Sequence, residues 1–279
     1  MDLAAASSYF DDVPLSDAYS GVLLGLGQIA PNDGAVRDGM VMARRTLSTA
    51  PDVIMPQRHA VTIEGTTFIA SDTPDQDYFQ GAVIRNVYTL HRSDGLAEVK
   101  PIAQELSGIV GNYAHAAVVW LKGTKEIDES SRLINYADIY FAKDNGALVG
   151  QLVKLNGGLF LVREQYTTVS GFDVSVVDQL DTPSFETANY TSRVYDPLTD
   201  SHTSLINPIV ALRLRWQTKF EYLSSGSTKY VSGDDVVIVL ASAVPSPTTG
   251  DFITLSDGIR RVESIQAEGD LWHLHVRRA

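Results

Sequence analysis

Two stretches of the chain, 100 positions apart, share one design: Leu152-Val-Lys-Leu-Asn-Gly-Gly-Leu-Phe-Leu-Val-Arg-Glu164 and Phe252-Ile-Thr-Leu-Ser-Asp-Gly-Ile-Arg-Arg-Val-Glu-Ser264. Each has an alternating segment, a turn that contains Asn-Gly or Asp-Gly, and a second alternating segment. Such a turn needs positive φ at its centre, and alternation of apolar and polar residues is typical of a half-buried strand. Both stretches therefore predict β-hairpins, with Gly158 and Gly258 at equivalent turns.

The similarity extends beyond the hairpins. Trp120 is followed 18 residues later by Asp138, and Trp216 is followed 19 residues later by Asp235; each aspartate opens an apolar segment. After the hairpins come further alternating segments, at residues 172–177 and 271–276. Because these features recur in one order, the sequence predicts a tandem duplication of a small β domain.

A third hairpin is predicted earlier, over residues 60–69. Its Gly65 lies 93 residues before Gly158, and a strand-rich continuation follows at residues 81–90. We interpret this segment as a divergent or partial copy of the same unit.

Residues 1–50 are predicted to form a short helical N-terminal region. Ser16 is placed to cap a helix over residues 17–29, which the Pro31-Asn-Asp-Gly34 turn would end. A second helix is predicted over residues 35–48. Its apolar residues recur at helical spacing: Val36, Met40, Ala43 and Leu47.

The fold class predicted from these patterns is mainly β, with tandem small antiparallel barrel or sandwich domains. Residues 51–112 are predicted as a divergent β unit plus a short helix from residue 101 to about 111. Residues 113–180 and 209–279 are predicted as β domains. Residues 181–208 are polar and have little periodicity, so we expect an extended linker or arm there.

Residues 210–217 are predicted as a half-buried strand of an antiparallel sheet. One face would carry Val210, Leu212, Leu214 and Trp216, and the other Arg213, Arg215 and Gln217. Trp120 and Trp216 lie on the apolar faces of such strands. We therefore expect both tryptophans to anchor the cores of their domains and not to stack on a ligand.

Composition narrows the possible functions. The 279 residues include 34 acidic and 22 basic side chains, which give a formal net charge of −12 and a pI near 4.8. This balance disfavours non-specific DNA binding, which needs Lys and Arg at the phosphates. With no cysteine there is no disulfide framework. No apolar run approaches the ~18 residues that a membrane span needs, and the N-terminus is acidic where a secretory signal is basic.

Few residues suggest chemistry. His273 and His275 share one face of a predicted strand, so they could be two ligands of a metal site, but solvent or a partner is the favoured environment. Asp72, Asp75 and Asp77 alternate as in a calcium loop but lack its glycine and glutamate, which favours a solvated turn. Serine-nucleophile and Walker A motifs are missing. We assign no catalytic, cofactor-binding or metal residue.

The C-terminal unit resembles the head–tail joining or stopper proteins of tailed bacteriophages. The resemblance rests on Gly250-Asp-Phe-Ile-Thr-Leu-Ser-Asp-Gly-Ile-Arg-Arg-Val-Glu-Ser-Ile265 and on Leu271-Trp-His-Leu-His-Val-Arg-Arg278. Members of that family typically have a Gly-Asp-hydrophobic entry, a glycine turn and a closing strand that ends in basic residues. Their domains are usually single, whereas this chain carries two or three units.

The resemblance implies a non-enzymatic virion protein that forms a ring of six or twelve copies in the neck. Its partners would be itself, the portal protein and tail proteins, with DNA passing through the lumen without specific binding. It would assemble in the host cytoplasm, and neither a cofactor nor a membrane would take part. The alternatives are another virion component, such as a capsid decoration or tail-tube-associated protein, a β-rich hydrolase that uses His273 and His275, and a carbohydrate-binding module.

Overall fold

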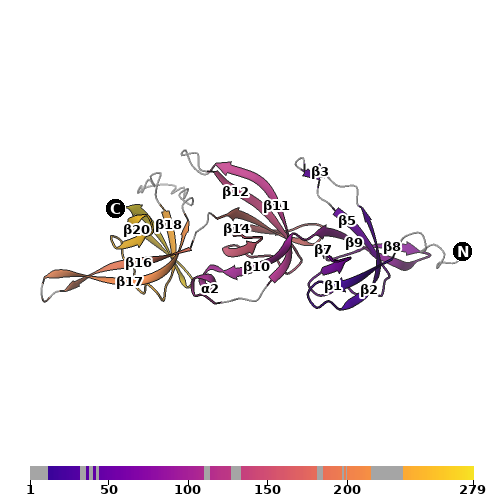
Figure 1. Cartoon of the computed structure of the whole chain (residues 1–279), viewed down its shortest axis with the longest axis horizontal. Coiled ribbons are helices and arrows are strands. Elements are labelled where there is room, and N and C mark those ends of the chain that lie inside the picture. The colour runs from indigo at the N-terminus through magenta and orange to yellow at the C-terminus, as the bar shows by residue number, and fades with distance from the viewer. Residues whose placement is uncertain are drawn as a thin grey trace. The chain divides into compact units, whose positions relative to one another are not determined.

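The strands of the chain close into three six-stranded antiparallel barrels, shown in indigo to purple, magenta, and orange to yellow in Figure 1. The structure is a computed structural model. It describes residues 12–31, 36–37, 40–41, 44–109, 114–126, 133–180, 185–196, 198, 200–214 and 235–279. The predicted fold class, tandem small β-barrels, is confirmed at this level.

Barrel 1 has the strand order β5-β2-β1-β6-β7-β9 and closes because β9 also pairs with β5. Its strands are β1 (Val13–Asp17), β2 (Leu23–Pro31), β5 (Arg44–Thr49), β6 (Ala60–Ile63), β7 (Thr66–Ala70) and β9 (Ala82–Arg92). β8 (Asp75–Phe79) pairs with β9 and extends the sheet beyond the barrel. A separate two-stranded sheet is formed by β3 (Val36–Arg37) and β4 (Met40–Val41).

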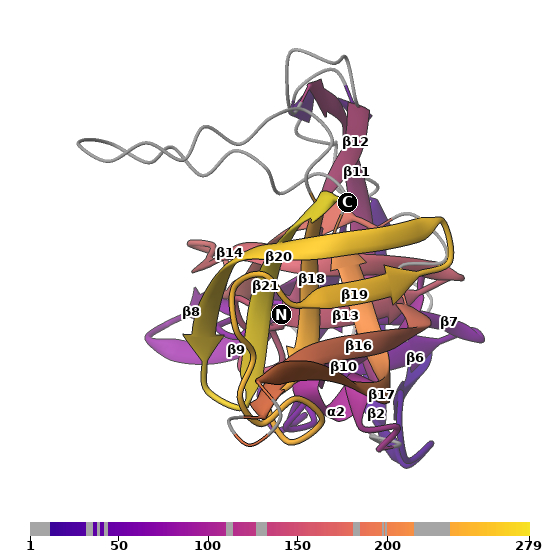
Figure 2. The same ribbon diagram turned by 90° about the vertical axis from the view of Figure 1, so that its left-hand side faces the viewer.

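Barrels 2 and 3 are closed sheets with the orders β10-β11-β12-β15-β14-β13 and β16-β17-β18-β21-β20-β19. The strands of barrel 2 are β10 (Gly95–Pro101), β11 (Ala114–Glu126), β12 (Leu133–Ala142), β13 (Gln151–Leu155), β14 (Gly158–Thr167) and β15 (Phe172–Gln179). Those of barrel 3 are β16 (Phe185–Asp196), β17 (Ser201–Leu214), β18 (Asp235–Leu240), β19 (Phe252–Leu255), β20 (Gly258–Glu268) and β21 (Leu271–Arg278). In Figure 2 the wall of barrel 3 that contains β19 and β20 crosses the wall that contains β18 and β21.

All three barrels have one strand order. Around each ring the strands follow the order first, second, third, sixth, fifth and fourth, counted along the chain. The fourth strand then pairs with the first and closes the ring. The predicted hairpins are the fourth and fifth strands of their barrels: β6–β7, β13–β14 and β19–β20. The repeat of these hairpins is therefore confirmed, and the segment that we interpreted as a divergent copy belongs to a complete third barrel.

The registers of the three hairpins match residue by residue. The pair before each two-residue turn is Ile63↔Thr66, Leu155↔Gly158 or Leu255↔Gly258. Glu64 and Gly65, and likewise Asn156 and Gly157, have positive φ, whereas in the third hairpin the positive φ falls on Gly258. Apolar residues at alternate positions of these hairpins fill the barrels: Val61, Ile63 and Phe68; Val153, Leu155 and Phe160; Ile253, Leu255 and Val262.

The predicted N-terminal helices are wrong, because this region supplies β1, β2 and β5 of barrel 1. Leu15 and Leu47 are fully buried in the barrel core. A Cβ on Gly27 would lie 2.7 Å from Leu47 Cδ1 and 2.9 Å from Leu15 Cδ1, so this glycine allows β1 and β5 to pack across β2. The carboxylate of Asp17 accepts hydrogen bonds from the N–H groups of Tyr19 and Ser20, which closes a turn after β1 in place of a helix start.

The extended linker or arm predicted at residues 181–208 is corrected where the structure describes it, because this segment forms β16 and the first part of β17 in barrel 3. β16 and β17 pair continuously from Phe185↔Leu212 to Asp196↔Ser201, and β16 closes barrel 3 through β19. Only the distal part of this hairpin, residues 192–205, lies beyond the pairing with β19 and projects from the barrel (Figure 1). The polar sequence fits this ribbon, because its described side chains at positions 193, 198, 200 and 203–205 are exposed. Barrel 2 starts at Gly95, so the predicted boundary at residue 113 also moves.

The short helix predicted from residue 101 to about 111 is shorter in the structure: α2 spans Ile102–Leu106, and residues 110–113 lie outside the described ranges. Ile102 and Leu106 are buried, and α2 packs beside β17 and β18.

The chain divides into two compact units. One contains barrel 1 and most of barrel 2, and the other contains α2 and barrel 3. Within the first unit, apolar residues of both barrels form one buried cluster that includes Ile69 of barrel 1 and Phe172 of barrel 2. Lys143 Nζ donates to Asp72 Oδ2 at 2.6 Å, and the amide of Ala116 donates to the Tyr19 hydroxyl at 2.8 Å. Barrels 1 and 2 are therefore joined by both apolar and polar contacts.

Replacing Gly157 with valine is expected to destabilise barrel 2 by about 1–2 kcal/mol, because an L-residue pays that cost in the left-handed region. Gly157 has φ +78° and no neighbour that a Cβ would meet, so the effect is on the backbone alone. Gly157→Asn is the control, since asparagine tolerates this conformation. Thermal unfolding should show a larger decrease in Tm for Gly157→Val than for Gly157→Asn. Equal decreases in Tm would contradict the turn assignment.

Candidate functional site

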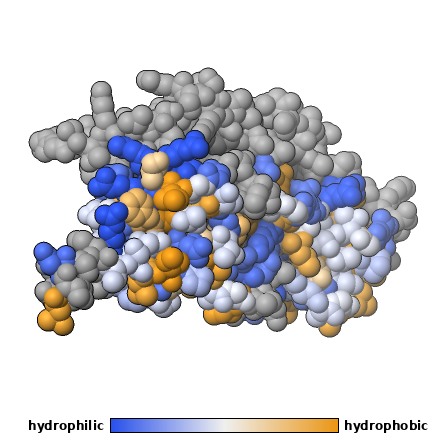
Figure 3. Space-filling model, turned by 60° about the vertical axis from the view of Figure 1, so that its left-hand side comes forward, coloured by the Kyte–Doolittle hydropathy of each residue, from blue (hydrophilic) through white to orange (hydrophobic). Residues whose placement is uncertain are grey.

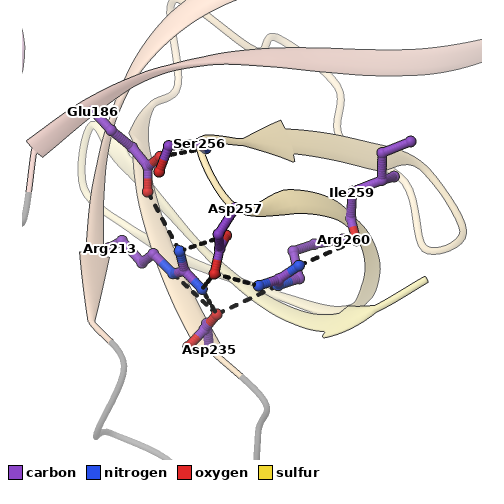
Figure 4. A network of polar contacts seen from close by, with 7 residues as sticks. All are labelled: Glu186, Arg213, Asp235, Ser256, Asp257, Ile259 and Arg260. Carbon is purple, nitrogen blue, oxygen red and sulfur yellow. Dashed lines mark hydrogen bonds and ion pairs between the residues drawn. The ribbon is translucent and has the colours of Figure 1, made fainter.

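Five charged side chains gather at the end of barrel 3 where the β19–β20 turn lies (Figure 4). We call them the ionic cluster: Glu186 of β16, Arg213 of β17, Asp235 of β18, Asp257 of the turn and Arg260 of β20. Four different strands and one turn therefore meet through charged groups.

Strand alternation places these side chains on the inner face of the barrel. Ile209 and Ala211 belong to the core and precede Arg213 at the same face of β17. Arg260 lies opposite the core residue Ile253 in the β19–β20 register. Asp235 lies on the face of β18 that also carries Val237. The cluster thus continues the apolar core of barrel 3 to its mouth.

This arrangement corrects the predicted faces of residues 210–217. Leu212 and Leu214 are buried, but on the outer surface of the barrel, and Val210 is half exposed. Arg213 was predicted on the polar face, but this face points into the barrel. Arg215, Trp216 and Gln217 lie outside the described residues.

Arg213 is the centre of the cluster. Its Nη1 donates to Asp257 Oδ1 at 2.8 Å and its Nη2 to Asp257 Oδ2 at 3.0 Å, so both oxygens of that carboxylate are held. Its Nε and Nη2 donate to Asp235 Oδ2 at 3.0 and 2.5 Å. Paired donors of this kind match the planar geometry of a carboxylate.

Arg260 and Glu186 complete the network. Arg260 Nη2 donates to Asp257 Oδ2 at 2.9 Å, and its Nε lies 3.5 Å from Asp235 Oδ2. Glu186 Oε1 lies 3.7 Å from Arg213 Nη1, and Glu186 Oε2 accepts a hydrogen bond from the Ser256 amide at 2.7 Å. The turn is therefore tied to strand β16 as well.

Burial makes the pairing of these charges costly to break. The side chains of Arg213, Arg260 and Asp235 are each about 5% exposed, whereas that of Asp257 is 44% exposed. Burial alone would lower the pKa of Arg213, but the hydrogen bonds to Asp257 and Asp235 outweigh it and raise the pKa. Arg213 is therefore charged at any working pH, and its partners must offset the loss of hydration.

The other two barrels are built without such a cluster at the equivalent positions of this hairpin. In register, Arg260 corresponds to Phe68 of barrel 1 and Phe160 of barrel 2, and Asp257 corresponds to Gly65 and Gly157. The barrel fold accepts an apolar side chain at this site twice, so the charges of barrel 3 are a local specialisation.

A second buried polar group lies at the start of β19. Asp251 accepts hydrogen bonds from the Tyr190 hydroxyl at 2.6 Å and from the amide and hydroxyl of Thr248 at 2.9 and 2.8 Å. In barrel 2, Gln151 likewise accepts a hydrogen bond from the Leu148 amide at 2.9 Å. The contact belongs to the repeated architecture and closes the same loop in both barrels.

The two histidines weighed as metal ligands do share one face, and Leu274 and Val276 of the opposite face lie in the core. We expected them to face solvent or a partner. Solvent is wrong, because both are largely buried on the outer surface of barrel 3, and contact with a partner stays a prediction. His273 Nε2 lies 3.0 Å from Glu268 Oε2. Burial lowers the pKa of His273, against the opposing effect of Glu268.

The other residues considered from sequence do not meet at one site. Asp72 pairs with Lys143, while Asp75 and Asp77 belong to strand β8, where Asp77 pairs with Arg85. Asp138 faces away from the core of barrel 2, unlike Asp235 in barrel 3, because Ala137 and Ile139 point inward. Trp120 lies in β11, but its side chain and all of Trp216 are outside what the structure describes, so the core prediction for both is open.

Sequence reasoning missed the ionic cluster, although one signal was visible. Aligning the two quoted hairpins places Arg260 against Phe160, an inward residue. A charge at an inward position needs a partner, which indicates a buried network.

Across the described ranges, no group of three or more His, Asp or Glu side chains is arranged to hold a metal ion. Nor is any helix in those ranges long and apolar enough to cross a membrane. Comparison with protein-family models, curated proteins and solved structures returned no match for this chain.

Replacing Arg213 with methionine is expected to cost about 3–5 kcal/mol of unfolding free energy, because it leaves Asp235 buried with its main partner removed. Arg261→Met is the matched control: Arg261 is adjacent to the cluster in sequence but 57% exposed, so the change should stay within about 0.5 kcal/mol. Chemical denaturation measures both. Similar small losses in both variants would show that removing Arg213 does not leave Asp235 as an uncompensated buried charge.

The pH dependence of stability is expected to change in Tyr190→Phe. Burial alone would raise the pKa of Asp251, but the hydrogen bonds from Tyr190 and Thr248 outweigh it and lower the pKa. A carboxyl with a lowered folded-state pKa stabilises the protein above its ordinary value of about 3.9 and loses this contribution as pH falls. The stability gap between wild type and Tyr190→Phe should therefore be largest near neutral pH and shrink below about pH 4. A gap that is constant with pH would contradict this role.

Proposed function

We propose that this chain is a structural, non-enzymatic virion protein of a tailed bacteriophage that forms a ring in the neck between portal and tail. The observation that carries the proposal is that the chain uses one barrel topology three times. In barrel 3, the buried charges of the ionic cluster are paired with each other. A protein built from repeated barrels offers several surfaces for contacts with other proteins, which suits a structural role. The resemblance of the C-terminal unit to neck proteins supplies the place in the virion.

Different hairpins project from barrels 1 and 3, and both carry exposed apolar side chains. In barrel 1 it is β8–β9, with Tyr78, Phe79 and Ile84; in barrel 3 it is β16–β17, with Leu205 and Ile206. Figure 3 shows apolar surface on the described residues, including the end of the narrow projection at the left. Exposed apolar residues on such ribbons support subunit contacts, which a closed ring makes between different surfaces of neighbouring copies.

The net charge of −12 supports the same proposal. Acidic walls repel DNA phosphates, so a duplex could pass a lumen without binding. Copies with this charge also repel one another, so apolar and backbone contacts between copies must outweigh that repulsion.

Assembly is expected to depend on the distal β16–β17 hairpin. Replacing residues 193–204 with Asn-Gly, together with Leu205→Ser and Ile206→Ser, removes the exposed apolar side chains of Leu198, Leu205 and Ile206. The new turn joins positions 192 and 205, which already face each other in register. A two-residue turn of this type suits a hairpin, so barrel 3 should stay folded. Analytical ultracentrifugation should show loss of the ring, while circular dichroism stays unchanged.

The control for this truncation is Val169→Ser, which removes a fully exposed apolar side chain on the β14–β15 turn. We expect this variant to assemble as wild type does. A truncated protein that still forms rings would overturn the role of the hairpin.

A further inference from the structure

We propose that the mouth of barrel 3 is a carboxylate-binding site, which Asp257 fills in the free protein and an acidic side chain of a second copy fills in the assembly. The identity of the partner rests on the proposed function; the carboxylate site itself does not.

Asp257 is held as a bound ligand would be. Both of its oxygens accept hydrogen bonds from Arg213, and one also accepts from Arg260. Three donors from two rigid guanidinium groups surround one carboxylate, which is a geometry that selects planar anions.

Asp257 is also the most exposed member of the cluster. It sits on a two-residue turn between Leu255 and Gly258, and its side chain is 44% exposed. Arg213 and Arg260 lie beneath it, at about 5% exposure. An incoming carboxylate needs to displace only the exposed Asp257 side chain, because the Ser256 amide stays bonded to Glu186 and β19 stays paired with β20.

The lost hydrogen bonds favour an incoming carboxylate once Asp257 moves away. Arg213 Nη1 and Arg260 Nη2 then lose the Asp257 oxygens to which they donate, while both arginine side chains remain about 5% exposed. A carboxylate from outside restores these hydrogen bonds.

The repeat shows that the barrel does not need these charges. Phe68 and Phe160 fill the position of Arg260 in the other barrels. Apolar replacements of buried ion pairs are often neutral or stabilising, so a retained arginine pair is better explained by recognition than by stability. The chain has 34 acidic residues against 22 basic ones, which makes an acidic turn of a second copy a suitable occupant.

The test uses sodium acetate as the probe and thermal unfolding of the full chain as the readout. Asp257→Gly, which installs the residue found at Gly157, is compared with wild type and with Asp270→Gly, an exposed acid on the β20–β21 turn. Acetate replaces chloride at constant ionic strength. Because a ligand that binds the folded state raises the Tm, acetate should raise the Tm of Asp257→Gly by a few degrees more than that of the other two proteins.

The double variant Asp257→Gly/Arg260→Phe, which reproduces the pair Gly157 and Phe160, should lose the acetate response. Equal responses in all variants would overturn the site. A larger response to phosphate than to acetate would overturn its carboxylate preference.

Asp257→Gly should also sediment as a larger fraction of assembled protein than wild type. An unchanged assembled fraction together with the acetate response would overturn the second copy as occupant but leave the carboxylate site.

Discussion

Closure of each barrel is the constraint on which the rest of the structure depends. The first strand of every barrel pairs with the fourth, as β1 does with β6 and β16 with β19, so the sheet has no open edge inside the ring. A closed ring of six strands encloses a narrow interior, and every inward position must be filled by a side chain that suits its neighbours. This requirement fixes the apolar alternation of the hairpins. It also makes a charged residue at an inward position, such as Arg260, a conspicuous departure.

The three barrels share a common scaffold but differ in the elements that they expose. Their strand order and hairpin register are the same, whereas the projecting elements and the mouth of barrel 3 differ. In barrel 3, paired charges replace the phenylalanine of the other barrels and bind the turn, β16, β17, β18 and β20 to one another. Such a network gives little net stability when its desolvation is counted, but it holds these elements in one arrangement. The proposed roles in assembly rest on these local differences between otherwise equivalent units.

Sequence reasoning succeeded where a local signal decided the structure. The Asn156-Gly157 turn and the alternation around it require a hairpin, and the 100-residue repeat identified its copy. It failed where pairing between distant segments decided. Val36, Met40 and Leu47 recur at helical spacing, yet Leu47 is buried in barrel 1 because β5 pairs with β2 and β9. The faces of β17 could not be read either, since Leu212 and Leu214 are buried on the outside of the barrel and Arg213 on the inside.

We propose that copies of this chain form a ring on the head–tail axis of a virion. Electron cryomicroscopy of purified virions, with the chain identified by its three barrels, is the sharpest test. We expect a symmetric ring between portal and tail, with the β16–β17 hairpin of each copy in contact with a neighbouring copy. Density for the chain away from that axis, or a monomer in the presence of the portal protein, would contradict it.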